Sequence, residues 1–232
     1  YLSVLLFGCA ILVISTGARS SFGLFLPEMT QARGWSRETF SLAIALQNLM
    51  WGLGGSFLGA FADKHGSLRT LLLGGALYVA GLIGMAWAET GLGLSLSAGV
   101  LIGIAIGGTS FGIILATLGK LVPPEKRSLA FGIGVASGSL GQFLFLPLAG
   151  WLIAAFGWQM ALFVHAAIAA LIVVLAFGVR GDSLTAAQAA EIRLGDAMRT
   201  AFGGRSFPLL FWGYFGCGLQ IVFLQLHLPA CL

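Results

Sequence analysis

Seven long apolar stretches dominate this sequence and decide what it can fold into. Each approaches or exceeds 20 residues, which is longer than a strand or core helix of a soluble domain needs. Hydrophobic residues make up 58% of the 232 positions and charged residues only 9%, whereas a soluble domain carries about a quarter charged residues. The 12 basic and 8 acidic side chains cannot cover the surface of a water-soluble domain of this size. We therefore expect an all-α integral membrane protein.

Charged and turn residues divide the chain into seven predicted membrane-spanning helices. With a rise of about 1.5 Å per residue, each is long enough to cross a hydrocarbon core of about 30 Å. The predicted spans are residues 1–26, 39–62, 69–88, 94–119, 128–156, 158–179 and 208–228. This predicts a six-helix half over 1–179, a cytoplasmic linker with a short surface helix over 180–207, and a further spanning helix over 208–232. A sequence that begins at Tyr1 without methionine is expected to lack its true N-terminus.

The distribution of Lys and Arg predicts the orientation in the membrane. If the first helix starts in the cytoplasm, nine basic residues lie on the cytoplasmic side and only Arg33 and Arg37 lie opposite. The nine are Lys64, Arg69, Lys120, Lys126, Arg127, Arg180, Arg193, Arg199 and Arg205. We therefore predict a multi-pass protein of the plasma membrane, in bacteria the inner membrane, with a cytoplasmic N-terminus. These loops account for the net charge of +4, so nucleic acid is not an expected partner.

An internal repeat of about 90 residues organises the first six helices. The tripeptide Ser-Phe-Gly at residues 21–23 returns at 110–112, and Gly59 and Gly66 return as Gly150 and Gly157. Three helices in each copy make the two copies face opposite ways across the membrane. Inverted repeats are typical of secondary transporters, whose sites lie near the membrane midplane. The predicted fold is a six-helix bundle of two inverted three-helix repeats plus a seventh transmembrane helix.

The loop after the second predicted helix carries a charged motif made of Gly59, Asp63, Lys64, Gly66 and Arg69. This motif resembles the loop between the second and third helices of the major facilitator superfamily. The resemblance implies a twelve-helix transporter, so that the remaining helices come from a missing C-terminal half or from a partner chain. We expect the five residues to form a cytoplasmic gate in which Asp63 and Arg69 take part. The alternative is an ordinary basic cytoplasmic loop.

The fifth predicted helix narrows the resemblance to one branch. Residues 126–141 look like the start of the fifth helix in monocarboxylate transporters and bacterial oxalate/formate antiporters, whose extracellular turn is similar to Gly34, Trp35 and Ser36. This resemblance implies secondary active transport of a small organic anion, a mono- or dicarboxylate. The alternatives are another small solute such as a drug or metabolite, and a membrane receptor or structural protein. The glycines of this segment also offer a face for close helix packing.

Arg19 is the charged residue that the prediction places deep inside a span. It lies about eight residues, roughly 12 Å, from the outer end of the first helix, where a charge costs several kcal/mol unless it faces a cavity or a partner. All eight acidic residues lie outside the seven predicted spans. An anionic substrate would supply the opposite charge, because a guanidinium matches a carboxylate. A bond to carbonyls across a closed outer gate, or snorkelling to the interface, are the alternatives.

Other polar residues at membrane depth complete the predicted substrate site. Gln47, Trp51, Thr109 and Gln142 lie on helices that line the central cavity in the superfamily, with hydrogen bonding between helices as the alternative role. His165 is expected to be a hydrogen-bonded structural residue. His, Asp, Glu and Cys do not cluster at depth, so no enzyme activity, cofactor or metal is predicted. A water channel and a retinal protein are excluded because Asn-Pro is missing and because no lysine follows Pro208.

Overall fold

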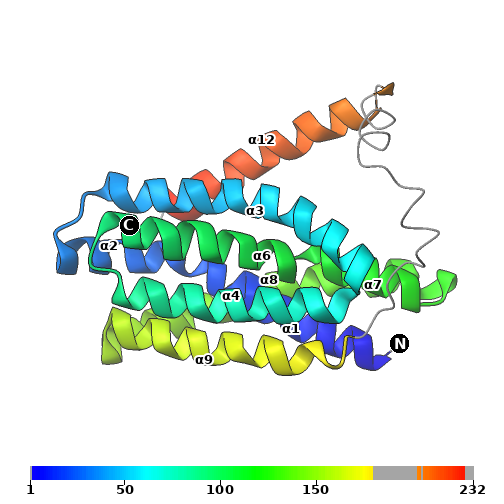
Figure 1. Cartoon of the computed structure of the whole chain (residues 1–232), viewed down its shortest axis with the longest axis horizontal. Coiled ribbons are helices and arrows are strands. Elements are labelled where there is room, and N and C mark those ends of the chain that lie inside the picture. Colours follow the sequence, from blue (N-terminus) through cyan, green and yellow to red (C-terminus); the bar gives the residue numbers. More distant parts are fainter. Residues whose placement is uncertain (1, 180–202, 205, 228–232) are drawn as a thin grey trace. The chain divides into compact units, whose positions relative to one another are not determined.

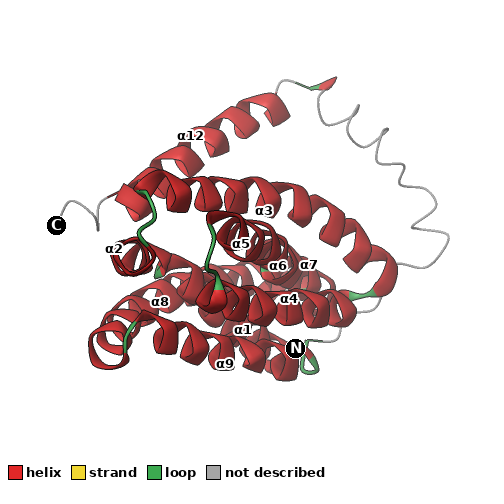
Figure 2. Cartoon of the chain, turned by 60° about the vertical axis from the view of Figure 1, so that its left-hand side comes forward, coloured by secondary structure: helices red, strands yellow, loops and turns green. Residues whose placement is uncertain are grey.

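The protein folds into helices that correspond to the seven predicted spans, except that the first helical stretch continues through Pro27 and ends at Arg33, seven residues beyond its predicted end. The structure is a computed structural model that describes residues 2–179, 203–204 and 206–227. The chain divides into two compact units, Tyr1–Ser183 and Leu184–Leu232. Within the described residues the structure contains helices and loops only (Figure 2). The all-α prediction is therefore confirmed.

Six predicted spans form the first unit. Two of them consist of several helical pieces in sequence, and the other four are single helices (Figure 1). The first span comprises α1 (Leu2–Ser20) and α2 (Phe22–Arg33), and the fourth comprises α5 (Gly91–Leu94), η1 (Ser95–Leu101), α6 (Ile102–Thr109) and α7 (Phe111–Leu121). The single helices are α3 (Arg37–His65), α4 (Ser67–Trp87), α8 (Pro124–Phe156) and α9 (Trp158–Ala176).

The helix breaks and turns follow the internal repeat. The first span breaks at Ser21 and the fourth at Ser110, which are the first residues of the two Ser-Phe-Gly tripeptides. The second and fifth spans each end at a glycine with a positive φ, 87° at Gly66 and 81° at Gly157. Both kinds of landmark found in the sequence therefore occupy equivalent places in the two three-helix repeats.

Helix packing follows the same symmetry. The most extensive contacts join α1 to α8, α4 to α9, and α3 to α6. The first pair joins the first span to the fifth and the last pair joins the second span to the fourth, so the inverted repeat converts one pair into the other. The pair α4 and α9 joins the third helix of each repeat. The six-helix bundle of two inverted repeats is thus the observed fold.

Glycines permit the closest of these crossings. A Cβ added to Gly107 of α6 would lie 2.6 Å from the backbone nitrogen of Gly55 on α3, and a Cβ on Gly141 of α8 would overlap the carbonyl of Val13 on α1. Thr16 of α1 adds a hydrogen bond of 2.9 Å to the Gly138 carbonyl on α8. The small-residue face predicted for the fifth span is therefore used for packing against the first.

Length and composition mark a multi-pass membrane protein. Among the described residues, five helical stretches are long and apolar enough to cross a bilayer: Leu2–Arg33, Ser67–Trp87, Gly91–Leu121, Pro124–Phe156 and Trp158–Ala176. With 29 residues α3 is also long enough, but Gln47, Asn48 and several glycines lower its hydropathy. In the second unit, α12 (Ser206–His227) corresponds to the seventh predicted span. Most of the predicted linker, residues 180–202 and 205, lies outside the described residues.

Candidate functional site

Arg19 lies one residue before the end of α1, at the break in the first spanning helix, and its side chain is part-buried. Its Nη2 donates a hydrogen bond of 2.6 Å to Oδ1 of Asn48 on α3. Its guanidinium carbon also lies 4.6 Å from the ring centroid of Trp51, one turn further along α3. The predicted residues Arg19 and Trp51 are thus brought together, and the cation lies over the face of an aromatic ring inside a membrane-spanning bundle.

Asn48 is a member of this group that the predicted site residues did not include. Its Nδ2 donates 2.8 Å to the carbonyl of Ile44 on its own helix, which turns Oδ1 toward Arg19. Asn48 and Trp51 are three residues apart and so lie on the same side of α3. This three-residue spacing is the sequence signal from which Asn48 could have been predicted as a member of the site.

Gln47 takes a different direction from its neighbour. It is 1% exposed, and its Nε2 donates 2.7 Å to the carbonyl of Ala98. Ala98 belongs to η1, a π-helical stretch in which the wider turns displace carbonyls from the usual helical pairing. In this conformation Gln47 therefore joins the second span to the fourth, which is the alternative role considered for it.

Thr109 is likewise buried between helices. Its Oγ1 lies 2.7 Å from Oγ of Ser15 on α1 and donates to the Ala105 carbonyl at 3.0 Å. The backbone carbonyl of Ser15 accepts a further bond of 2.9 Å from the Tyr78 hydroxyl on α4. Ser15 lies one turn before Arg19, so this network fixes the helix that carries the guanidinium. Gln142 occupies a part-buried position on α8, next to the crossing made by Gly141.

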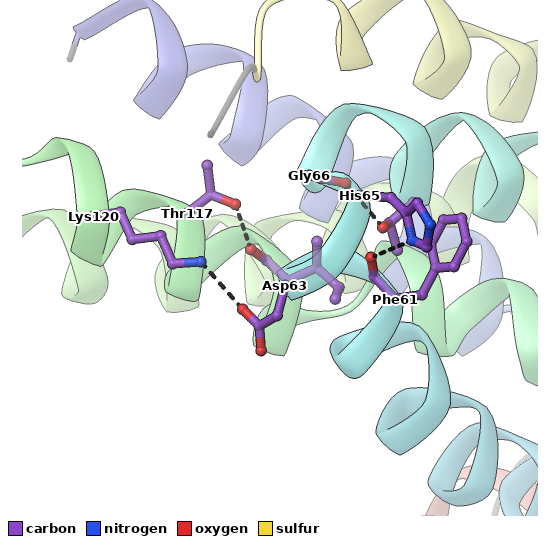
Figure 3. A network of polar contacts seen from close by, with 8 residues as sticks. Phe61, Asp63, His65, Gly66, Thr117 and Lys120 are labelled. Atoms are coloured by element: carbon purple, nitrogen blue, oxygen red, sulfur yellow. Dashed lines mark hydrogen bonds and ion pairs between the residues drawn. The ribbon is translucent and has the colours of Figure 1, made fainter. Parts of the chain in front are cut away.

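The charged motif lies at the C-terminal end of α3, where Asp63 meets Lys120 near the C-terminal end of α7 (Figure 3). The Asp63 carboxylate lies 3.2 Å from Nζ of Lys120, with the two side chains 53% and 40% exposed. Lys120 was not among the predicted gate residues. Lys64 and Arg69 have exposed side chains, and Gly66 forms the turn into α4. Asp63 therefore forms an ion pair with the fourth span, whereas the sequence predicts Arg69 as the other member of the gate.

A cavity of about 210 Å³ opens beside this ion pair. Small residues of α3 and α7 line it, among them Gly55, Gly59, Ala62, Gly112 and Ala116, with Asp63 and Lys120. A Cβ added at Gly59 would meet nothing within 4 Å. The second and fourth spans are therefore separated at this end by a small space with a charged rim.

His165 is fully buried on α9, against the break in the first span. Its Nε2 lies 3.3 Å from Oγ of Ser21 and its Nδ1 lies 2.7 Å from the carbonyl of Ala161. The rings of Phe25 and Phe145 meet it edge-on at 5.7 and 5.5 Å. The predicted hydrogen-bonded environment is present, and it includes the residue at which the helix breaks.

Comparison with known proteins shows what the chain is similar to. A family model described as Major Facilitator Superfamily matches residues 8–230. Monocarboxylate transporter 13 of Rattus norvegicus is 31% identical over 174 residues, which are 73% of this chain and 39% of that protein. Monocarboxylate transporter 14 of Mus musculus is 26% identical over 160 residues, 67% of this chain and 30% of that protein. The chain thus spans well under half the length of these relatives.

Solved transporters share the fold at low identity. The peptide transporter POT in complex with sulfate has a TM-score of 0.66 and 19% identity, covering 95% of this chain and 46% of that one. The inward-open xylose transporter XylE from E. coli has a TM-score of 0.56 and 16% identity, covering 94% and 54%. These likenesses concern the fold alone. Together with the family match over nearly the whole length and the inverted repeat in the bundle, they mean that the chain belongs to the Major Facilitator Superfamily.

Proposed function

We propose that the full-length protein is a secondary active transporter that moves a small organic anion, a mono- or dicarboxylate, by alternating access. The observation that carries this proposal is the guanidinium of Arg19, held inside a membrane-spanning bundle by Asn48 and Trp51. The similarity to proteins named monocarboxylate transporters supports the same class of substrate.

The geometry around Arg19 suits a carboxylate. The N–H donors of a guanidinium lie in the plane of the group, which is the direction from which a carboxylate approaches. The attraction of Arg19 to the Trp51 ring beneath its guanidinium carbon does not use these donors. The Asn48 amide and the Trp51 ring both orient the cation. A substrate anion is proposed to bind the guanidinium when it enters, with Gln47, Thr109 and Gln142 on the helices around it.

Alternating access requires two halves that move against each other. We propose that a second six-helix half, or a partner chain, packs against this bundle and encloses a substrate cavity at Arg19. The excess of basic residues on one side supports an orientation with the N-terminus in the cytoplasm of a plasma membrane, in bacteria the inner membrane. A transport protein of this kind needs no enzymatic activity.

The proposed cytoplasmic gate is built around Asp63. The ion pair with Lys120 joins the second and fourth spans, while Gly59, Gly66, Lys64 and Arg69 form the turn and basic surface beside it. An exposed ion pair contributes about 0–1 kcal/mol. That is enough to change the ratio of two conformations of similar free energy several-fold.

Uptake by reconstituted protein tests the proposed substrate class. The full-length protein is placed in liposomes, and the uptake of labelled lactate, oxalate and formate is followed beside an uncharged sugar and a lipophilic cation. We expect uptake of at least one of the three anions, with competition by the unlabelled compound. Uptake of the sugar or the cation, with none of the anions transported, would overturn the proposal and favour another small solute.

A further inference from the structure

Two neighbouring serines with different surroundings lie at the break in the first spanning helix. Oγ of Ser20 donates 2.7 Å to the carbonyl of Gly17, and Oγ of Ser21 donates 2.8 Å to the carbonyl of Ala18. Hydroxyls that bond the preceding turn in this way weaken and bend a helix. Ser21 differs from Ser20 because its oxygen also faces the His165 ring at 3.3 Å. The break is thus in contact with α9.

The hydrogen bonds of His165 fix its role toward Ser21. A backbone carbonyl only accepts, so Nδ1 donates to Ala161 across 2.7 Å. In a neutral imidazole Nε2 is then an acceptor, and the Ser21 hydroxyl has one proton and two acceptors, the Ala18 carbonyl and Nε2. A hydroxyl that donates to the Ala18 carbonyl bonds the preceding turn of its own helix. A hydroxyl that donates to Nε2 of His165 joins the break to α9. Ser21 therefore has two alternative arrangements that a change in the helix can exchange.

We propose that His165 is a positioning residue for Arg19 and that it acts through Ser21. This inference rests on the proposed function, in which Arg19 binds the anion. Arg19 is hydrogen-bonded to Asn48 on α3. When the Ser21 hydroxyl donates to Nε2 of His165, Ser21 is bonded to α9, and the break is then held from both sides. Loss of the contact to α9 lets the break relax and moves the guanidinium away from its place over Trp51. A displacement of about 1 Å is enough to lower productive binding strongly.

The anion affinity of paired variants tests this role. The probes are lactate, oxalate and formate, and equilibrium binding to detergent-solubilised full-length protein is measured together with the unfolding temperature. Ser21→Ala and His165→Leu are expected to weaken binding about tenfold. Ser20→Ala, the matched control, removes a hydroxyl that, among the described residues, donates to a carbonyl of its own helix, and it should leave affinity unchanged. Lower unfolding temperatures with unchanged affinity would make His165 merely structural and overturn the inference.

Conservative variants of His165 distinguish the contributions of its two ring nitrogens to anion binding. The amide nitrogen of His165→Asn reaches the place of Nδ1 and retains the bond to Ala161, so this variant should bind as poorly as the leucine. The longer His165→Gln reaches the place of Nε2 and should recover most of the affinity. In an Arg19→Gln background, Ser21→Ala should cause no further loss, because its effect passes through Arg19. An additional tenfold loss there would overturn the inference.

A distance measurement distinguishes this inference from the proposed function. Spin labels replace the exposed residues Leu6 on α1 and Gln31 on α2, in protein whose three cysteines are changed to alanine, and span about 37 Å across the break. Ser21→Ala should shift or broaden the distance distribution, and Ser20→Ala should not. If the parent binds none of the anions but the distribution shifts, the proposed function fails while His165 still sets the break. An unchanged distribution overturns the inference in either case.

Discussion

Gly66 and Gly157 have nearly the same backbone conformation, with φ 87° and ψ 157° at the first and φ 81° and ψ 163° at the second. Each is the single residue between two long helices, α3 and α4 or α8 and α9. This region of backbone conformation is essentially restricted to glycine. Each three-helix repeat therefore joins its second helix to its third by the same one-residue turn.

Replacing Gly157 tests that turn. A Cβ at this position would meet nothing within 4 Å, so Gly157→Ala is disfavoured by the backbone conformation alone, by about 1–3 kcal/mol. The control is Gly150→Ala, inside α8 and also in open space, where alanine should be neutral or stabilise the helix by up to about 1 kcal/mol. The free energy of unfolding in mixed micelles measures both. Equal values for the two variants would contradict the assigned turn.

A second substitution tests the crossing of the first and fifth spans. A Cβ on Gly141 would overlap the backbone of Val13, which cannot move without shifting α1. Gly141→Ala should therefore lower the free energy of unfolding by about 1–3 kcal/mol. Gly132→Ala on the same helix meets nothing within 4 Å and is the control. A loss in the control as large as that in Gly141→Ala would assign the effect to the helix rather than to the crossing.

The sequence was sufficient to predict the spans and their symmetry. Apolar length marks each span, and the repeated pair Gly66 and Gly157 marks positions where the backbone needs a conformation that other residues avoid. The repeated Ser-Phe-Gly predicted that the first and fourth spans correspond. It did not predict that both break there, because a serine inside a helix leads to a break only when its surroundings accept the bend.

The details of the site depend on packing that the sequence does not express. Gln47 and Asn48 are adjacent amides on α3, and one points to the fourth span while the other points to Arg19. Which amide faces Arg19 depends on the rotation of α3 about its axis, which its contacts with η1 and α6 fix. Asp63 and Lys120 are 57 residues apart and meet only because the two repeats pack together. The π-helical stretch likewise has no signal in the composition of residues 95–101.

Substitutions of Asn48 and Gln47 distinguish a side chain that holds the guanidinium of Arg19 from one that joins two helices. Asn48→Leu removes the hydrogen bond to the guanidinium, and bonds to charged groups contribute about 1.5–3 kcal/mol, so anion affinity should fall about tenfold or more. Gln47→Leu leaves the Ala98 carbonyl without its bond from Gln47 and should lower the unfolding temperature. Equilibrium anion binding and thermal unfolding of the full-length variants measure the two effects. The reverse pattern would mean that Gln47 contacts the anion and Asn48 supports the fold.

The proposed gate predicts an effect on rate. Asp63→Asn removes the ion pair with Lys120 and should change the transport rate several-fold, while anion affinity stays within about twofold, because the pair lies at the end of the bundle away from Arg19. Lys120→Met should have a similar effect. The double variant should add little to either change, since both act on one ion pair. An affinity loss with normal turnover would contradict the gate.

Substitutions of Arg19 distinguish three roles for this cation: binding the anion, closing an outer gate, and snorkelling to the membrane interface. If it binds the anion, Arg19→Lys retains the charge but loses the planar fork, so affinity should fall about tenfold with normal expression. Arg19→Gln should bind still more weakly, because the positive charge is gone. If Arg19 instead closes an outer gate, both variants should change the reactivity of a cysteine placed at Gln31, even without anion.

If Arg19 instead snorkels to the membrane interface, the expected result differs from that for anion binding and from that for an outer gate. Both variants would then transport like the parent, and removal of a buried cation would leave the unfolding temperature equal or higher. Equilibrium anion binding by the parent and by the Lys and Gln variants distinguishes these outcomes, and unchanged affinity in both would rule out the binding role. The hydrogen bond to Asn48 and the cation–π contact with Trp51 favour the binding role, because they hold the guanidinium at one place within the bundle instead of letting it extend toward the membrane surface.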